Sequence, residues 1–265
     1  MSDLNPLSLW RRLLAAPNES RGKMLAMAFL VSGLSAFAVS TAAVVLGPRL
    51  DANRSAERQA RLEAMLTELP ALASLLETAG ADGLDIIVAD LTTGEAADVD
   101  ADTFDADLLE NDQITTLSAE QDIAGIGTRP DLAQIYVARD GSDIAAVILP
   151  VYGQGYQSVI RAYLALEGDL NTVAGLTITE QGETPGLGAN IQSASWQAKW
   201  PGALIADDTG TIRISVVKGG AEPPFEVNAI TGATRTSDAV QDMIRFWVGP
   251  DGFGPVLDAL AAGDL

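Results

Sequence analysis

Two short segments in the C-terminal half of the chain combine hydroxyl, glycine and charged residues in patterns that could hold an anionic ligand. The first covers residues 228–237, reads NAITGATRTS, and comes directly before a run with helical periodicity. Backbone amides at a helix start attract an anion, and Arg235 would add positive charge. A threonine hydroxyl there could therefore hold a phosphate, through hydrogen bonds or as a phosphoester. Spacing alone favours a simpler interpretation, in which Thr234, Thr236 and Ser237 cap the helix.

The second segment is a glycine-containing loop after an apolar run. Residues 183–188 read ETPGLG, and the glycines permit positive φ angles and a close approach of the backbone to a ligand. The loop amides could line a phosphate or the edge of a ring, although an ordinary turn is the commoner meaning of such a pattern. Lys218, which precedes two glycines, could neutralise an anionic ligand, but a lone lysine more often lies on the surface.

Two missing residue types limit the chemistry of the chain. It contains no cysteine and no histidine, so the usual ligands of iron–sulfur clusters, haem and structural zinc are missing. Nucleophilic pairs built on histidine or cysteine are excluded as well. No pair of carboxylates stands out as a general acid and base. Redox chemistry would therefore need an organic cofactor, although a plain binding domain would have the same composition.

The net negative charge of the chain lies entirely in its C-terminal part. Residues 83–265 carry 8 basic and 28 acidic side chains, which accounts for the whole net charge of −20. Such a surface repels phosphates and argues against nucleic acid as a partner, and it also serves solubility. Residues 84–128 contain 12 acidic side chains and no basic one. They indicate a solvated acidic loop rather than a calcium site, because the spacing of an EF-hand is absent.

The N-terminal part contains one candidate membrane anchor. Residues 24–46 are free of charge and would span roughly 34 Å as a helix, enough for a bilayer core of about 30 Å. The apolar region of a cleaved signal peptide is normally shorter, about 7 to 15 residues. We therefore predict a tail at 1–23, a transmembrane helix at 24–46 and a helical stalk at 47–82 with Pro70 inside it. Arginines flank both ends of the span, so charge bias leaves its orientation open.

Residues 83–265 are predicted to form one α+β domain on a largely antiparallel sheet. Asp140-Gly141 between two apolar runs predicts a hairpin. Trp196 and Trp200, four apart, are typical of a core-facing stripe near a short helix at 193–199. A last helix is predicted at 237–247, with one apolar face. Residues 84–95, LDIIVADLTTGE, are predicted to be a strand that enters a turn, and further strands are predicted at 133–138, 145–153, 158–168, 173–182 and 211–219.

Several segments along the chain resemble one known family. They are the anchor, ILPVYGQG, EQGETPGLG, TGAT with TS following, FWVGPDGFGPVL and the terminal AAGDL. Together they resemble the C-type subunit of the bacterial sodium-translocating NADH:quinone oxidoreductase. The G-type subunit of the Rnf electron-transport complex shares the anchor, the ETPGLG-like loop and the TGAT-like segment, but less of the closing segment, so it ranks second. A non-enzymatic, membrane-anchored binding module is the alternative from another class.

The resemblance implies a covalent flavin. In the family, the last threonine of the motif Asp-x-x-Ser/Thr-Gly-Ala-Thr carries FMN as a phosphoester, which corresponds to Thr234 here. This chain has Asn228 where the motif has Asp, and the aromatic residue often found after the YGxG turn is displaced to Tyr156. The other residues implied to contact the cofactor are Thr231, Gly232, Ala233, Arg235, Glu183, Thr184, Pro185, Gly186, Leu187, Gly188 and Lys218.

The resemblance also implies a place in a larger assembly. FMN would receive electrons from a metal centre in neighbouring membrane subunits and pass them to the next flavin of the complex. This chain itself would bind no metal, and it shows no nicotinamide fingerprint. A separate, exported flavin transferase would attach the FMN with FAD as donor. The anchor would cross the bacterial inner membrane once, in contact with lipid, and the domain would be periplasmic.

Overall fold

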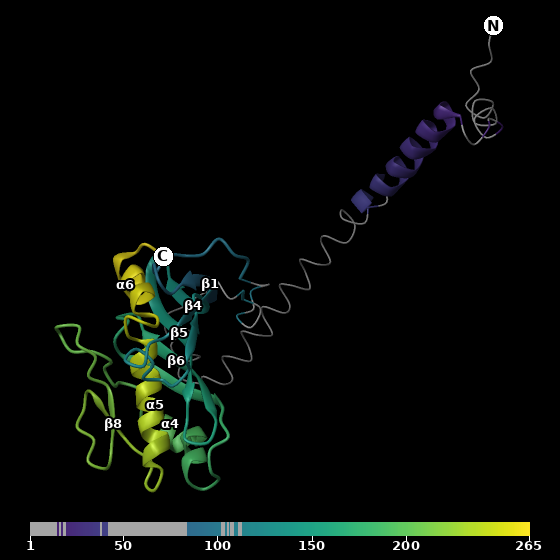
Figure 1. Cartoon of the computed structure of the whole chain (residues 1–265). Coiled ribbons are helices and arrows are strands. Elements are labelled where there is room, and N and C mark those ends of the chain that lie inside the picture. Colours follow the sequence, from purple (N-terminus) through teal and green to yellow (C-terminus); the bar gives the residue numbers. More distant parts are fainter. Residues whose placement is uncertain are drawn as a thin grey trace. The chain divides into compact units, whose positions relative to one another are not determined.

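We describe the protein from a computed structural model. The structure describes residues 84–265 apart from 102–103, 105, 107–108 and 111–112, together with residues 15, 17, 20–37 and 39–41 of the N-terminal part. The chain divides into two compact units, Met1–Gln59 and Ala60–Leu265. Each unit is described by itself (Figure 1).

The N-terminal unit contains one long apolar helix. In the described part of this unit it covers Arg21–Thr41, 21 residues that include an 18-residue stretch with a mean hydropathy of 1.8, and by length and composition it could cross a membrane. A signal sequence would meet the same criteria, so this helix is a candidate span. It overlaps the predicted anchor at 24–46. Residues 42–46 of that anchor and the predicted stalk at 47–82 lie outside the described residues.

The second unit is built on a five-stranded antiparallel sheet with the order β1-β4-β5-β6-β7. The predicted hairpin at Asp140-Gly141 is confirmed, because Asp140 pairs with Asp143 across the turn between β4 and β5. Gly141 has a φ of +62°, a value that glycine adopts without strain. The strands cover Leu84–Asp90 (β1), Leu132–Asp140 (β4), Asp143–Gln154 (β5), Val159–Glu167 (β6) and Val173–Glu180 (β7).

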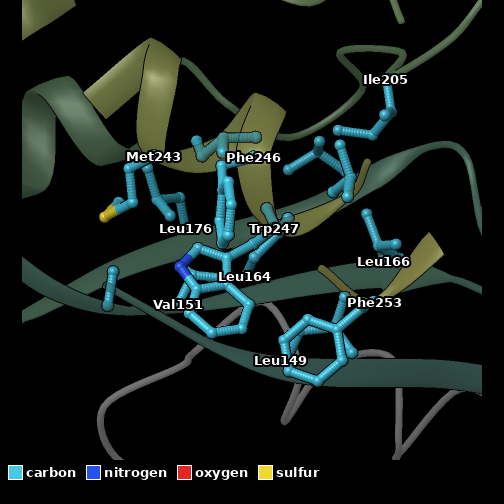
Figure 2. Close-up of a cluster of buried hydrophobic side chains, with 14 of the residues drawn as sticks. Leu149, Val151, Leu164, Leu166, Leu176, Ile205, Met243, Phe246, Trp247 and Phe253 are labelled. Atoms are coloured by element: carbon cyan, nitrogen blue, oxygen red, sulfur yellow. The ribbon is translucent and has the colours of Figure 1, made fainter. Parts of the chain in front are cut away.

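The sheet has two apolar faces, as expected when side chains alternate along a strand. In β4, Ile135 and Val137 point to the larger cluster of buried side chains, while Tyr136 and Ala138 belong to a smaller one. The larger cluster lies between the sheet and the C-terminal helices. Figure 2 shows its centre, with side chains from β5, β6 and β7 meeting those of a helix that crosses the sheet.

The bounds and number of the helices in the second unit differ in part from those predicted. The last predicted helix, 237–247, begins three residues earlier, and the helix predicted near 193–199 has only four residues. A further helix follows Gly252 and was not predicted, because its run GPVLDALAA shows no polar face. The helices in the described part of the second unit are Gly188–Gln192 (η3, a 3-10 helix), Ala194–Gln197 (α4), Thr234–Trp247 (α5) and Gly254–Ala262 (α6).

The strand predicted at 211–219 is shorter than expected. Only Ser215–Val217 (β8) is a strand, and it pairs in parallel with Glu226–Asn228 (β9). The preceding residues form a turn in which Asp207 accepts hydrogen bonds from the Thr209 hydroxyl and from the amides of Thr209 and Thr211. These bonds, that of the Thr209 hydroxyl first, lower the pKa of Asp207. The turn removes 211–214 from the strand.

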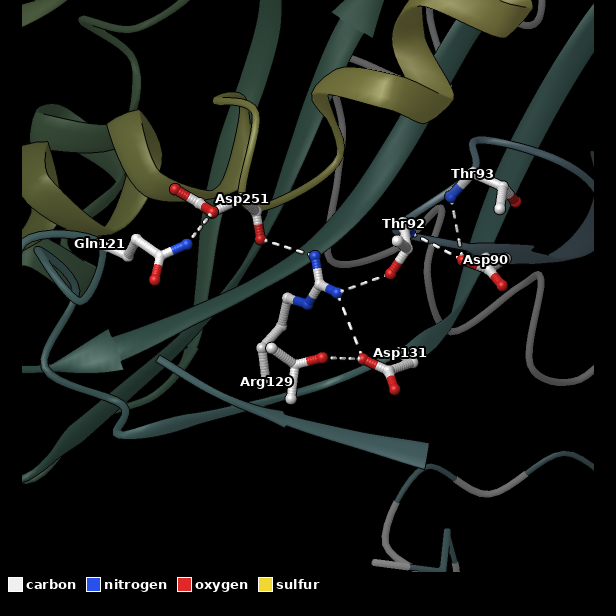
Figure 3. Close-up of polar contacts among 8 residues, drawn as sticks. Asp90, Thr92, Thr93, Gln121, Arg129, Asp131 and Asp251 are labelled. Carbon is white, nitrogen blue, oxygen red and sulfur yellow. Dashed lines mark hydrogen bonds and ion pairs between the residues drawn. The ribbon is translucent and has the colours of Figure 1, made fainter. Parts of the chain in front are cut away.

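A buried arginine, Arg129, contacts residues of three loops at one end of the sheet (Figure 3). Arg129, 5% exposed, lies in Thr128–Pro130 (β3), which pairs with Ile114–Thr116 (β2). Its guanidinium forms an ion pair with Asp131 and donates hydrogen bonds to the Thr92 hydroxyl and the Asp251 carbonyl. Arg129 therefore ties the turn after β1 to the α5–α6 connection.

The predicted fold class, α+β with a largely antiparallel sheet and flanking helices, is confirmed.

Candidate functional site

Thr234 is the first residue of α5. Gly232, with a φ of +83°, and Ala233, with φ −126° and ψ 49°, turn the chain into the helix. No side chain caps this helix start, so the capping interpretation is wrong. The hydroxyl of Thr236 donates instead to Glu183, and that of Ser237 accepts a hydrogen bond from the Ile230 amide. The amides of the first turn are therefore not satisfied by these hydroxyl groups.

Glu183 joins the helix start to two loops. Its side chain is 4% exposed, and its Oε1 accepts hydrogen bonds from the amides of Gln157 at 2.8 Å and Ser158 at 3.4 Å. Its Oε2 accepts the hydroxyl of Thr236 at 2.6 Å. A buried carboxylate needs such donors, because burial without partners is costly. Glu183 thus fixes the turn at 155–158, the loop at 183–188 and the first turn of α5 against one another.

Two glycines are required by this arrangement because there is no room for a side chain. A Cβ atom at Gly188 would lie 2.5 Å from Thr236 Oγ1 and 2.9 Å from Glu183 Oε2. One at Gly155 would lie 2.6 Å from Glu183 Oε1. At Gly188 the backbone approaches the side chains of Thr236 and Glu183 closely, whereas its approach to a ligand stays a prediction. Positive φ occurs at Gly186, at +75°.

A cavity of about 270 Å³ opens where these segments meet. It combines both segments singled out from the sequence, with Tyr156 added from the turn after β5. Ligand pockets commonly measure about 300–1,000 Å³, so this cavity is slightly smaller than that range. The cavity is lined by Tyr156, Thr184, Leu187, Gly188, Gly232, Ala233, Thr234, Arg235 and Thr236.

The other predicted contact residues lie around this cavity or away from it. Glu183 is buried and bonded to Thr236, one of the lining residues. Thr231, Pro185 and Gly186 are exposed and do not line the cavity. Lys218 is exposed directly after β8 and does not line it either. Thr236 was not predicted as a cofactor-binding residue, because its contact with Glu183, 53 residues earlier, arises only from folding.

Asn228, which departs from the family motif, lies at the end of β9 and outside the cavity lining. Its side-chain oxygen accepts a hydrogen bond from the Ala221 amide at 3.2 Å, and its carbonyl accepts the indole N–H of Trp196 at 2.9 Å. A carboxylate could accept the first of these bonds equally well. Trp196 is itself buried with Trp200, their ring centroids 5.5 Å apart, as predicted for a core stripe.

The cavity is positively polarised. Arg235 is the only charged residue that lines it in the described part of the chain, and the amino end of α5 adds partial positive charge. Leu187 and the ring of Tyr156 supply apolar surface on the same cavity. In the same described residues no three acidic side chains gather into a group that could hold a metal ion. A helix start with a hydroxyl, a cation and apolar neighbours suits a ligand with one phosphate and one flat ring.

This combination is that of an FMN-binding domain. The family described as FMN-binding domain matches residues 155–249, a range that includes every residue lining the cavity. The chain thus contains a flavin-binding domain on the C-terminal side of a candidate membrane span.

Comparison of the full chain with known proteins identifies its family more closely. The chain is 37% identical to the NqrC subunit of the Na(+)-translocating NADH-quinone reductase of Yersinia pestis over 94% of this chain and 96% of that protein. It is 36% identical to the corresponding subunit of Vibrio parahaemolyticus over 95% and 100%. The crystal structure of Shewanella oneidensis NqrC has a TM-score of 0.67 at 29% identity and covers 78% of this chain and 99% of that one. The chain belongs to the NqrC family, the C-type subunits of the Na(+)-translocating NADH-quinone reductase, an oxidoreductase complex.

Proposed function

We propose that this chain is an electron-transfer subunit that carries FMN as a phosphoester on Thr234. The observation that carries the proposal is the position of Thr234 at the helix start inside the cavity. Its hydroxyl makes no hydrogen bond to any other described residue, whereas Thr236, two residues further on, is bonded to Glu183. Thr231 is exposed and lies outside the lining. Thr234 is therefore the hydroxyl best placed for attachment.

The attachment would be a transfer from FAD by a separate flavin transferase. Thr234 Oγ1 would form a bond to the phosphorus of the FMN half, and the pyrophosphate bond of FAD would break. AMP would leave with the electron pair, and the hydroxyl proton would pass to a base of the transferase or to solvent. The amides at the start of α5 would stabilise the remaining negative charge of the phosphodiester.

Bound FMN would supply the electron-accepting ring, which the side chains of this chain lack. Leu187 and Tyr156 would contact its apolar surface, and the backbone at Thr184 and Gly188 would line its edge. Glu183 would act indirectly, by holding these segments in place. Electrons would arrive from a metal centre in a neighbouring subunit and leave to the next flavin of the complex.

The proposed topology follows the predicted division of the chain. Residues 1–23 would be a cytoplasmic tail, 24–46 a single transmembrane helix in the lipid of the bacterial inner membrane, and 47–82 a stalk. Residues 83–265 would form the periplasmic domain. A flavin that is covalently held is not lost by dissociation in an exported compartment. Partner subunits of the quinone reductase would surround the anchor and the domain.

The test is covalent flavin on a denaturing gel. The full chain is co-expressed with a flavin transferase, and in-gel fluorescence is compared for the parent and for Thr234→Ala, Thr231→Ala and Thr184→Ala. We expect the band to vanish in Thr234→Ala alone. A band that survives in Thr234→Ala and vanishes in Thr231→Ala would place the attachment site at Thr231. A parent without fluorescence would exclude a covalent flavin.

A further inference from the structure

Arg235 lies beside the proposed attachment site and contacts one aromatic ring. Its guanidinium carbon is 5.2 Å from the ring centroid of Tyr156, a distance typical of a cation–π contact. Both residues line the cavity and both are solvent-exposed. Among the described residues no carboxylate forms an ion pair with Arg235. Its charge is therefore directed to the cavity mouth and is not neutralised by a neighbour.

Arg235 and Tyr156 belong to two segments that are held together by hydrogen bonds. Tyr156 stands next to Gln157, whose amide is held by Glu183, and the same turn is tied to the ETPGLG loop by the bond from the Gly182 amide to Ser158 Oγ at 2.6 Å. Arg235 stands next to Thr236, which donates to the same carboxylate. The backbone positions that carry the ring and the guanidinium are thus held relative to each other.

A fixed cation is important here because the rest of the domain is strongly acidic. Residues 83–265 carry 28 acidic and 8 basic side chains, and a negative field opposes the addition of electrons to a bound flavin. Glu183 is buried, accepts a hydrogen bond from Thr236 and does not line the cavity. Arg235 and the amino end of α5 act in the opposite direction, by attracting negative charge.

We propose that Arg235, positioned by the ring of Tyr156, raises the midpoint potential of the FMN. This proposal rests on the proposed function and assigns a positioning and tuning role to two residues of its site. A cation close to the ring stabilises the reduced flavin, which carries more negative charge than the oxidised one. The aromatic contact holds the cation at the cavity, and because both side chains are exposed, salt screens part of its effect.

The test is a redox titration of the flavinylated full chain in detergent, with dithionite and mediator dyes. We expect Arg235→Gln to lower the midpoint potential by a shift equivalent to a threefold to tenfold change in the reduction equilibrium. A tenfold change corresponds to about 30 mV for a two-electron couple. Arg235→Lys keeps the charge and should retain most of the potential. Tyr156→Phe should match the parent, and Tyr156→Leu should give a smaller decrease than Arg235→Gln.

Two further variants identify the responsible cation. Lys199→Gln removes an exposed charge from a residue that does not line the cavity and should leave the potential unchanged. Lys218→Gln tests the lysine that, from the sequence, could neutralise an anionic ligand. An unchanged potential in Arg235→Gln, or an equal decrease in Lys199→Gln, would overturn the proposal. So would a larger decrease in Lys218→Gln.

Flavin fluorescence on a denaturing gel keeps the two proposals separate. If the parent and all variants fluoresce but their potentials agree, the covalent flavin stands and the role of Arg235 is wrong. If Arg235→Gln alone loses the flavin, Arg235 serves attachment, and the tuning proposal is overturned. If no protein fluoresces, the proposed function itself fails.

Discussion

At the scale of single residues, the site depends on a carboxylate that does not itself line the cavity. Glu183 is buried and accepts hydrogen bonds from two amides of one loop and one hydroxyl of α5. The chemistry proposed for Thr234 and Arg235 needs their segments to be held at a constant distance. Glu183 meets that need because it bonds both segments at the same time.

Glu183→Ala should destabilise the domain strongly. The variant leaves the Gln157 amide and the Thr236 hydroxyl without a buried partner, and each such loss costs about 1–3 kcal/mol. We expect the free energy of unfolding to fall by roughly 3 kcal/mol, measured by chemical denaturation of the detergent-solubilised chain with tryptophan fluorescence.

Glu180→Ala is the matched control for this change. Glu180 lies three residues earlier, its side chain is 70% exposed, and its ion pair with Arg161 is 3.3 Å long. Exposed pairs of this kind contribute about 0–1 kcal/mol. Equal losses in the two variants would show that Glu183 does not organise the site.

At the scale of elements, α5 connects the core to the cavity. Its amino end forms part of the cavity, and its apolar face packs on β5. At Gly153 the strand approaches so closely that a Cβ atom would lie 3.0 Å from the Cβ of Met243. The indole N–H of Trp247 donates to the Tyr152 carbonyl at 2.6 Å. The helix is thereby held along its length, which fixes the position of Thr234 at its start.

Met243→Ala should weaken this packing. Met243 is fully buried, and truncation of a buried methionine to alanine typically costs about 2–5 kcal/mol. We expect the midpoint of denaturation to fall accordingly, with partial loss of covalent flavin when the transferase meets a loosened helix. Asp238→Ala, at an exposed position of the same helix, should cost about 0.5 kcal/mol or less. Comparable losses from both variants would contradict the packing argument.

At the scale of the whole molecule, the chain offers a direct test of its topology because it has no cysteine. A single Ser142→Cys variant places one thiol in the exposed turn between β4 and β5. We expect a membrane-impermeant maleimide to label this thiol in spheroplasts before lysis, since the domain is proposed to be periplasmic. A matched Ser2→Cys variant in the N-terminal tail should be labelled only after lysis. The reverse pattern would invert the proposed orientation.

Local patterns in the sequence were enough to predict much of the fold. Apolar runs between turn signals identified the five strands of the main sheet, because a strand with two covered faces needs apolar side chains on both. The Asp140-Gly141 turn and the apolar face of 237–247 were local signals of the same kind. Helix α6 and the division of 211–219 were missed, because an almost entirely apolar helix has no period and the Asp207 turn competes with strand formation.

The candidate site was determined jointly by sequence and tertiary structure. The sequence alone singled out the two segments around Thr234 and Gly188, since glycine, threonine and arginine before a helix are local features, and family resemblance selected Thr234. Only folding decided that the Thr236 hydroxyl belongs to Glu183, that Arg235 faces Tyr156, and that Lys218 lies outside the lining. The two contacts join residues 53 and 79 positions apart. Packing, and not local spacing, brings such residues together.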